Sequence, residues 1–328
     1  MTWRVLALGV AAALGLGILA CGDDEEQITA GLIIKQDTNP FFVEIEDVAK
    51  DVAGDENVEL LTAAGKSDVD NASQVAALAD MTERGAKGIL ITPANSTEVV
   101  PAIEQARAAG VTVIALDTPT DPDTAVDALF ATDNLEAGEL IGRYARAKAV
   151  QDGIEPRVAL LDLGPGSDSG RLRREGFLAG FGIEEADPQI AGVVDTEGNE
   201  EKAEAGMRQL LEADPDINIV YSVNEPAAFG AAAALEAAGK SDDDVIVVSV
   251  DGGCEAIKRG IRTGEIDATA QQYPENMATK GIEALAAAAR GGDKPSGYLD
   301  TGVELITASP VDGLESKDEA FGVRNCWG

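Results

Sequence analysis

Polar side chains that could bind a ligand follow several of the predicted strands. Asp117 and Asp251 each come directly after an apolar run and directly before a turn. Asn224 and Gln272 end two further runs, and Lys35 follows the first one. An open α/β sheet meets its ligand at the carboxyl ends of its strands, so these residues are the candidates for a binding site. A simple turn aspartate is the alternative for Asp117 or Asp251 alone, but their matching positions in two halves of the chain favour binding.

An amide and two aromatic rings follow the first predicted strand. Asn39 precedes Pro40, which is the pattern of a helix N-cap with proline in the first helical position, and capping alone would explain this asparagine. Phe41 and Phe42 are adjacent and cannot both face the helix core, so we expect one of them to face a cleft. Its flat face could stack on the C–H side of a sugar ring.

Arg173 lies in one of the few arginine clusters of an acid-rich chain, and a solvated helix face is its alternative. Two aspartates, an arginine, two asparagines and a glutamine around an aromatic ring offer paired donors and acceptors to the hydroxyls of a polyol. Nothing in this set makes a nucleophile or a tuned acid–base pair, so we do not predict an enzyme.

The composition excludes several classes of function. The chain has 328 residues and no histidine, which excludes Ser-His-Asp and Cys-His nucleophiles and imidazole metal sites. Its 25 Lys+Arg against 59 Asp+Glu give a net charge of −34, which argues against nucleic acid or anionic lipid as a partner. The glycine-rich loop 164–170 lacks GxGxxG and the P-loop lysine, and no cysteine spacing suits zinc, so we predict no cofactor. We interpret the acidity as adaptation to salt, which an unfolding midpoint that falls with added salt would contradict.

Short β-branched runs alternate with longer helical stretches from residue 28 onward, which predicts a doubly wound parallel α/β architecture. The number of strands favours two similar lobes. Glycines at positions 54, 85, 110, 153, 239 and 291 are expected to end helices. The predicted strands are Ile28–Ile34, Val58–Thr62, Gly88–Thr92, Val111–Leu116, Leu129–Thr132, Val158–Leu163, Ile190–Val194, Ile217–Val223, Val245–Val250 and Ile266–Gln272.

The strand-helix alternation is interrupted near residues 118–132, 272–274 and 301–303. We expect the chain to cross between the lobes at these three places, which makes a hinged clamshell with its cleft at the strand ends. The predicted N-terminal lobe is 28–132 plus 273–302. The predicted C-terminal lobe is 133–272 plus 303–328.

Residues 1–20 have the pattern of an export signal, with Arg4 before an apolar run that is too short for a comfortable membrane span. The run ends at Ile18-Leu19-Ala20-Cys21, which resembles a bacterial lipobox, and the polar stretch 21–27 would be a tether. We predict a lipid anchor on Cys21, with a plain signal peptide as the alternative. Cys254 and Cys326 then remain as an even pair in an oxidising compartment, and we predict a disulfide. Two unrelated buried thiols are the alternative.

Over essentially the whole mature chain, the sequence resembles type I periplasmic sugar-binding proteins, the ribose-binding-like receptors of ABC importers. The resemblance is carried by residues 38–42, 116–117, 130–134, 173, 176–177, 222–225, 250–252 and 271–274. It implies a clamshell that closes around a monosaccharide and presents it to an ABC permease, and we expect a monomer. By position, the sugar would contact Lys35, Asn39, Phe41, Phe42, Asp117, Arg173, Asn224, Asp251 and Gln272.

More narrowly, residues 115–122, 224–228, 250–254 and the ending Cys326-Trp327-Gly328 resemble fructose-binding receptors of bacterial importers. This resemblance also supports the pairing of the two cysteines. Ribose receptors have arginine where Thr118 stands, a small hydroxyl residue where Lys35 stands, and an aromatic residue near Gly198, so fructose or a related hexose is favoured. The alternative is a sensing module that passes its ligand state to a membrane receptor. A transcriptional regulator is disfavoured, because an export signal replaces the DNA-binding helices.

Overall fold

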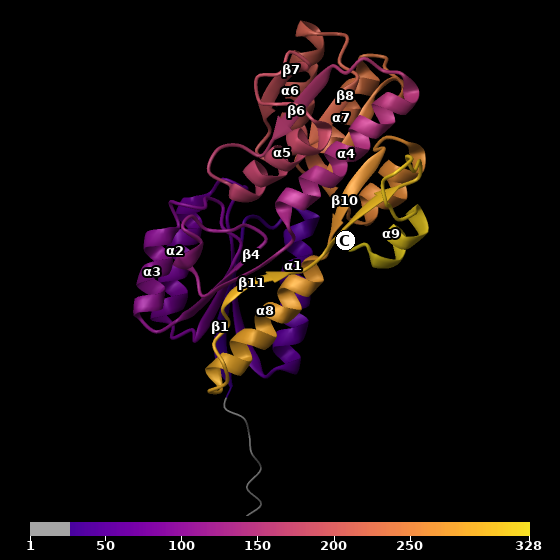
Figure 1. Ribbon diagram of the computed structural model, residues 1–328. Coiled ribbons are helices and arrows are strands. Elements are labelled where there is room, and N and C mark those ends of the chain that lie inside the picture. The colour runs from indigo at the N-terminus through magenta and orange to yellow at the C-terminus, as the bar shows by residue number, and fades with distance from the viewer. Residues whose placement is uncertain (1–26) are drawn as a thin grey trace, which may run out of the picture.

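The computed structural model describes residues 27–328, which form two lobes joined at one side (Figure 1). The predicted export signal 1–20, Cys21 and all but the last residue of the tether lie outside the described residues. Within residues 27–328, none of the helices has the length and apolarity that a membrane span requires.

The first lobe is built on a sheet in which every strand pair is parallel. Its order is β11-β5-β4-β3-β1-β2. Helices α1 (Pro40–Asp55) and α8 (Pro274–Ala289) lie together on one face, and α2 (Asn71–Glu83) and α3 (Val100–Ala108) lie on the other. Successive residues of a strand point to opposite faces, so Leu32 packs under the first pair and Ile33 under the second. The strands are β1 (Ile28–Ile34), β2 (Val58–Ala64), β3 (Gly88–Ile91), β4 (Thr112–Leu116), β5 (Ala128–Ala131) and β11 (Gly297–Asp300).

The second lobe repeats this plan with the order β12-β10-β9-β8-β6-β7. Its pairs are parallel except that β12 runs antiparallel to β10. Helices α4 (Asn134–Asp152) and α5 (Asp168–Phe181) cover one face, whereas α6 (Glu200–Ala213) and α7 (Glu225–Ala237) cover the other. Helix α9 (Glu319–Asn325) packs beside a π-helical turn at Ala256–Ile261. The strands are β6 (Val158–Asp162), β7 (Ile190–Asp195), β8 (Ile219–Ser222), β9 (Ile246–Asp251), β10 (Ala268–Gln272) and β12 (Val303–Thr307).

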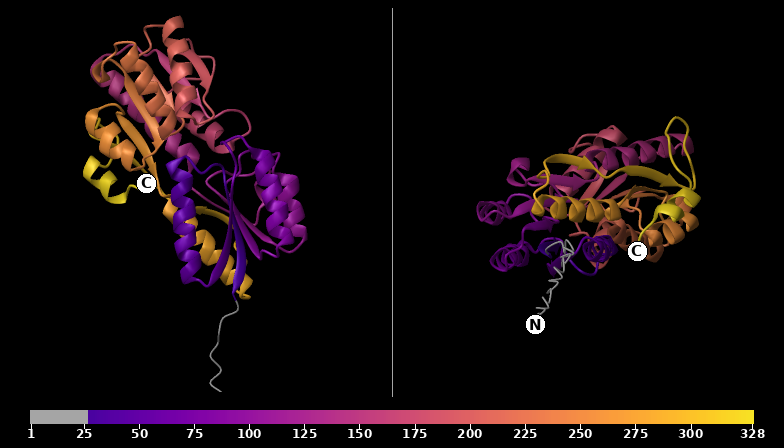
Figure 2. Two further views of the ribbon diagram at one scale, coloured as in Figure 1. Left: turned by 180° about the vertical axis from the view of Figure 1, so that it is seen from behind. Right: turned by 90° about the horizontal axis from the view of Figure 1, so that it is seen from below.

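The chain passes from one sheet to the other after β5, after β10 and between β11 and β12. Figure 2 shows both lobes from behind, with α8 returning to the first lobe after the long excursion through the second. The two sheet orders place β1, β2, β3 and β4 in the positions that β6, β7, β8 and β9 take in the second lobe. This arrangement supports the proposed lobe boundaries at residues 132, 272 and 302.

Several local predictions are confirmed and one is wrong. Gly85, Gly110, Gly153, Gly239 and Gly291 all have positive φ values, as left-handed helix ends require. Gly54 instead lies inside α1, which continues to Asp55, and Glu56 caps the helix with its backbone N–H. The expectation that Gly54 ends this helix was therefore incorrect, because Asn57, with φ of +49°, takes the left-handed position that follows the helix.

Candidate functional site

Two aspartates occupy equivalent strand ends in the two lobes. Asp117 follows β4 and Asp251 ends β9, and both side chains are buried. Their φ values are +61° and +102°, in the left-handed region that residues other than glycine rarely adopt. Such backbone strain persists where the surroundings impose it, and it concentrates at functional sites. The matching positions predicted from the sequence are confirmed by the two sheet orders.

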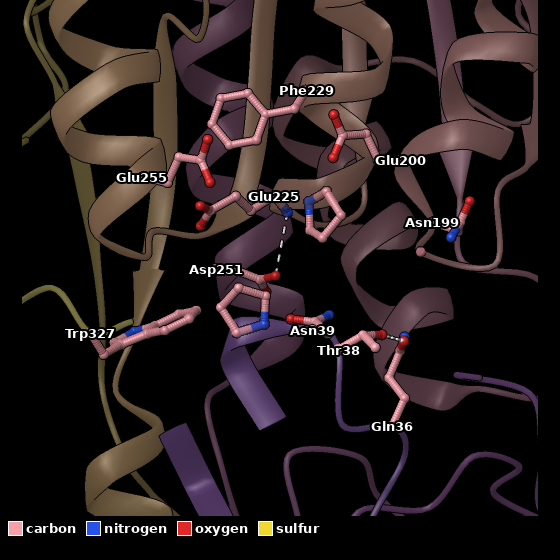
Figure 3. A pocket seen from close by; sticks show the side chains of 13 residues that line it. Gln36, Thr38, Asn39, Asn199, Glu200, Glu225, Phe229, Asp251, Glu255 and Trp327 are labelled. Atoms are coloured by element: carbon pink, nitrogen blue, oxygen red, sulfur yellow. Dashed lines mark hydrogen bonds between the residues drawn. The ribbon is translucent and has the colours of Figure 1, made fainter. Parts of the chain in front are cut away.

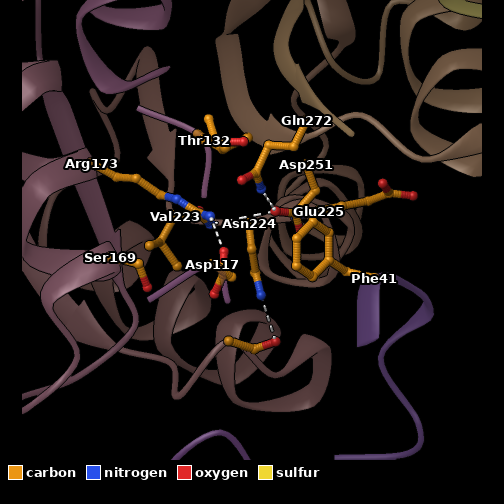
Figure 4. Close-up of polar contacts among 12 residues, drawn as sticks. Phe41, Asp117, Thr132, Ser169, Arg173, Val223, Asn224, Glu225, Asp251 and Gln272 are labelled. Atoms are coloured by element: carbon orange, nitrogen blue, oxygen red, sulfur yellow. Dashed lines mark hydrogen bonds and ion pairs between the residues drawn. The ribbon is translucent and has the colours of Figure 1, made fainter. Parts of the chain in front are cut away.

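Arg173 of α5 lies between these two carboxylates (Figure 4). Its Nη2 is 3.4 Å from Asp117 Oδ1, and its Nη1 is 3.4 Å from Asp251 Oδ1. The guanidinium also donates to Asn134 Oδ1 at 2.7 Å and to the backbone oxygen of Val223 at 3.0 Å. Arg173 is thus buried in the cleft, so the alternative of a solvated helix face is wrong for this residue.

Lys35 enters the same site from the end of β1 and is only 1% exposed. Its ammonium donates to Thr118 Oγ1 at 2.9 Å and lies 3.6 Å from Asp117 Oδ2. It also stands over the ring of Phe42, 5.6 Å from the centroid. Thr118 Oγ1 is in turn 2.9 Å from Ser169 Oγ of the second lobe, so one threonine links a first-lobe cation to the opposite lobe.

Both asparagines cap helices that begin at the cleft. Asn39 accepts from the N–H of Phe41 at 2.9 Å, and Asn224 accepts from the N–H of Ala227 at 3.1 Å. The Asn224 amide also donates to the backbone oxygen of Gly198 at 3.1 Å. Capping fixes the direction of each side chain, and both still line the cavity between the lobes.

The two phenylalanines behave differently from the expectation. Phe41 and Phe42 are both buried, both belong to the first-lobe core, and both line the cavity. Their rings meet edge to face, with centroids 5.4 Å apart. The expectation that one faces the core and the other the cleft was incorrect, because the cavity floor is continuous with the core at the start of α1.

Asp68 is a site residue that the sequence did not single out. It lies between β2 and α2, is 2% exposed, lines the cavity and accepts from Gln36 Nε2 at 2.6 Å. Burial raises its pKa to about 6, against the opposing effects of Lys35 and Gln36. The site therefore holds the carboxyls of Asp68, Asp117 and Asp251 together with the two cations Lys35 and Arg173.

Gln272 lies behind the cavity and does not line it. Its amide donates at 2.8 Å to Asp251 Oδ1, the same oxygen that faces Arg173, and so helps to fix that carboxylate (Figure 4). Gln272 is also the last residue of β10, where the chain crosses between the lobes. Gln272 thus orients Asp251 and does not reach the ligand space itself, although a direct contact with the sugar was predicted.

The cavity has a volume of only about 20 Å³, so side chains nearly fill it. A sugar ring could enter only after the lobes part. Its lining is polar on one side and aromatic on the other, and consists of Lys35, Asn39, Phe41, Phe42, Asp68, Asp117, Leu163, Ser169, Arg173, Asn224 and Asp251.

Direct hydrogen bonds hold the lobes together at the rim of the cavity. Ser96 N donates to the backbone oxygen of Gly166 at 2.7 Å, and Asp168 N donates to Ser96 Oγ at 3.0 Å. The glycine-rich loop of the sequence therefore serves as a contact between lobes. At Gly198, whose φ is +65°, an added Cβ would lie 2.7 Å from Asp68 Oδ2, so the closed cleft has no room for a larger side chain there.

A larger pocket adjoins the cavity along one edge of the cleft (Figure 3). Asn39 and Asp251 line both spaces, and Glu225 and Trp327 line the outer pocket. Glu225 accepts from the N–H groups of Gly253 and Ala256 at 2.8 and 2.9 Å, and burial raises its pKa to about 7. Across residues 27–328, no cluster of three or more acidic or cysteine side chains has the arrangement of a metal site.

Comparison with known families identifies this architecture. The periplasmic binding protein domain matches residues 30–293. The chain belongs to this family. Its relatives include the ribose import binding protein of Salmonella typhimurium, which is 32% identical over 255 residues, 78% of this chain and 82% of the relative. The D-ribose/D-allose-binding protein of Pseudomonas aeruginosa is 29% identical over 293 residues, 86% of this chain and 90% of the relative.

Solved structures of the family share the fold. An ABC transporter solute-binding protein from Mycobacterium smegmatis, solved with bound glycerol, is 30% identical with a TM-score of 0.75, covering 85% of this chain and 93% of that one. One from Agrobacterium vitis, solved with bound D-fucose, has a TM-score of 0.79 at 24% identity, covering 92% and 100%. The predicted family and the two-lobed α/β fold are both confirmed. Periplasmic binding proteins are transport components, and they perform no catalysis.

Proposed function

We propose that this protein is the exported receptor of a sugar ABC importer, and that it binds one monosaccharide between its lobes. The observation that carries the proposal is Arg173, buried between Asp117 of one lobe and Asp251 of the other. Carboxylates accept hydroxyl protons and a guanidinium donates in a fixed fork, so this triplet can read neighbouring hydroxyls of one ring. Phe41 and Phe42 supply the apolar surface for the C–H face of the sugar.

The residues that line the cavity support a polyol as the ligand, because carboxylates, cations and amides lie beside two phenyl rings. Within the monosaccharides we favour fructose. Lys35 and Thr118 form a pair at the first-lobe aspartate, and Gly198 leaves no room for a second-lobe aromatic ring. Both features differ from the ribose-receptor pattern, and they agree with the resemblance to fructose receptors.

Closure of the lobes supplies the coupling to transport. A sugar that touches Asp117 and Asp251 together gains contacts from both lobes only in the closed form, so binding shifts the equilibrium toward that form. The contacts across the rim, such as Thr118 with Ser169, add to the same state. The permease then recognises a closed receptor that carries its ligand.

Calorimetric titration of the purified chain with fructose, ribose, allose, glucose and inositol tests the proposal. We expect saturable heat with a stoichiometry of one, strongest for fructose. A stronger response to ribose or allose would refute the fructose assignment alone. The absence of heat with every monosaccharide would refute the sugar-receptor function.

Sugar affinity is expected to rise with pH through about 6, the pKa of Asp68. Protonated at pH 5, Asp68 offers a neutral hydrogen bond, whereas the carboxylate at pH 7.5 accepts a charge-assisted bond that is stronger by about 1 kcal/mol, or about fivefold in affinity. Burial also raises the pKa values of Asp251 and Glu225, but these two groups titrate in wild type and in Asp68→Asn alike. The ratio of the two proteins' sugar affinities, measured at each pH, therefore reports on the Asp68 carboxyl alone. A ratio that is constant from pH 5 to 7.5 would show that Asp68 does not act on the sugar.

We also propose that Cys254 and Cys326 form a disulfide in the exported protein. Their Cα atoms are 4.8 Å apart, within the range that a bridge requires. We expect neither residue to react with a thiol reagent in the unfolded, unreduced protein and both to react after reduction. Reduction should lower the free energy of unfolding by about 2–4 kcal/mol. Labelling of either residue before reduction would contradict the bridge.

We propose, finally, that Cys21 carries the membrane anchor. The predicted lipobox at residues 18–21 supports this, and the tether would leave the lobes free to move. Mass spectrometry of the exported protein would show an N-terminal Cys21 bearing acyl chains. An unmodified N-terminus would leave the plain signal peptide as the correct interpretation.

A further inference from the structure

Trp327, in the C-terminal tail Cys326-Trp327-Gly328, lines the outer pocket beside the candidate site (Figure 3). Trp327 is 5% exposed and belongs to the core of the first lobe, although the helix before it packs on the second lobe. Its backbone oxygen accepts from Cys254 N at 2.8 Å. Its indole Nε1 donates to the backbone oxygen of Gln272 at 2.9 Å.

The ring of Trp327 lies behind the aromatic wall of the sugar cavity. It meets Phe41 edge to face, with centroids 5.4 Å apart and planes at 76°. Phe41 lines the cavity directly, and the terminal Gly328 lies next to Pro40. The tail therefore supports the first turn of α1, which carries the stacking surface.

The same indole also supports the second-lobe carboxylate. Its hydrogen bond fixes the backbone of Gln272, and the side chain of Gln272 donates to Asp251 Oδ1 at 2.8 Å. Trp327 thus contacts a ligand-lining residue of one lobe and the residue that orients the ligand-binding carboxylate of the other. It does so at the crossover after β10, where the lobes must move relative to each other.

We propose that Trp327 is a positioning residue for sugar binding, which sets Phe41 and Asp251 in one geometry and is held there by its link to Cys254. The proposal rests on the sugar-binding function above. Without the indole, Phe41 gains room to turn away from the cavity, and the carbonyl of Gln272 loses its buried donor. Two ligand-facing groups must then be ordered again at each binding event, which weakens affinity.

Trp327→Ala and Trp327→Phe test this role by calorimetry. We expect roughly a tenfold loss of affinity for fructose in Trp327→Ala, because two side chains lose their fixed positions. Trp327→Phe keeps a ring against Phe41 and lacks only the donor to Gln272, so it should restore roughly half of that loss on a logarithmic scale. Ile103→Ala removes a fully buried side chain of the first lobe far from the cleft, and should lower the melting temperature while leaving affinity unchanged.

A spectroscopic readout separates positioning from mere stability. The sequence has tryptophan at positions 3 and 327, so the full chain with Trp3→Phe has Trp327 as its single tryptophan, which can be excited selectively over the tyrosines. We expect its emission to shift and its quenching by acrylamide to fall on addition of fructose. Both changes should have the same midpoint in fructose concentration as the calorimetric titration. Cys326→Ser, which frees the tail, should weaken both the response and the affinity.

The outcomes discriminate between the inference and the function. Unchanged affinity in Trp327→Ala, or tryptophan fluorescence that does not change at saturating fructose, would overturn the positioning role and leave the receptor function standing. An equal loss of affinity in Ile103→Ala would also overturn it, since any destabilisation would then suffice. Failure of every monosaccharide to bind the wild-type chain would refute the function itself, and the inference with it.

Discussion

Replacing Asp117 or Asp251 by alanine is expected to lower sugar affinity at least about thirtyfold. Each carboxylate is buried and lies 3.4 Å from Arg173, so its loss leaves this cation with one carboxylate in place of two, and leaves the sugar without an acceptor. Truncating one member of such a buried pair at a binding site costs about 2–5 kcal/mol, and 2 kcal/mol is about thirtyfold. Titration calorimetry with the sugar that binds wild type measures the effect.

Controls separate this effect from damage to the fold. Asp117→Gly and Asp251→Gly also remove the carboxylate. Glycine adopts the observed positive φ values without strain, so these two variants do not add backbone strain to the loss of the carboxylate. Asp123→Ala, at an exposed position of the loop after β4, should bind as wild type does. Near-normal affinity in both alanine variants would remove the two aspartates from the site.

Arg173→Ala is expected to abolish detectable binding. It leaves the carboxyls of Asp68, Asp117 and Asp251 around one cavity with Lys35 as the remaining cation. Breaking buried ion pairs from one side also destabilises a protein by about 3–5 kcal/mol, which urea unfolding would detect. Arg173→Lys keeps the charge and loses the fork, so it should recover stability better than affinity.

Arg171 offers a matched control on the same helix. Its side chain is 52% exposed and pairs with Asp168 and Glu175 on the surface. Surface pairs of this kind contribute about 0–1 kcal/mol, so Arg171→Ala should bind sugar normally. Equal binding by the Arg171 and Arg173 variants would show that the cleft arginine is not a ligand contact.

The alternation of apolar runs and helices was sufficient to predict the two-lobed architecture, because parallel strands covered on both faces are hydrophobic along their whole length. The same rule places ligand groups at strand ends, so Lys35, Asp117 and Asp251 could be predicted individually. The edge strand Gly297–Asp300 was missed. It is exposed throughout, and its two apolar residues, Tyr298 and Leu299, are adjacent and do not alternate with polar ones. Its place is set by pairing with Ala128–Ala131.

Two contributions to the site could not be predicted from sequence for the same physical reason. Asp68 stands two residues before Asp70, an ordinary N-cap that accepts from Ser73 N, and nothing local distinguishes the buried aspartate from the capping one. Trp327 reaches Phe41 only because the tail folds back across the body of the protein. Both roles arise from segments far apart in the chain, whereas local patterns report on neighbours.

The order of strands has a consequence for biosynthesis. β11 completes the first sheet beside β5, and β12 completes the second beside β10, yet both come after every other strand in the chain. A nascent chain that has not yet reached Gly297 therefore exposes β5 and β10 as sheet edges, which β11 and β12 cover in the complete protein. Exposed strand edges invite pairing with other chains. Truncation before Gly297 would thus leave both lobes incomplete, because the same last segment of the chain finishes the two sheets.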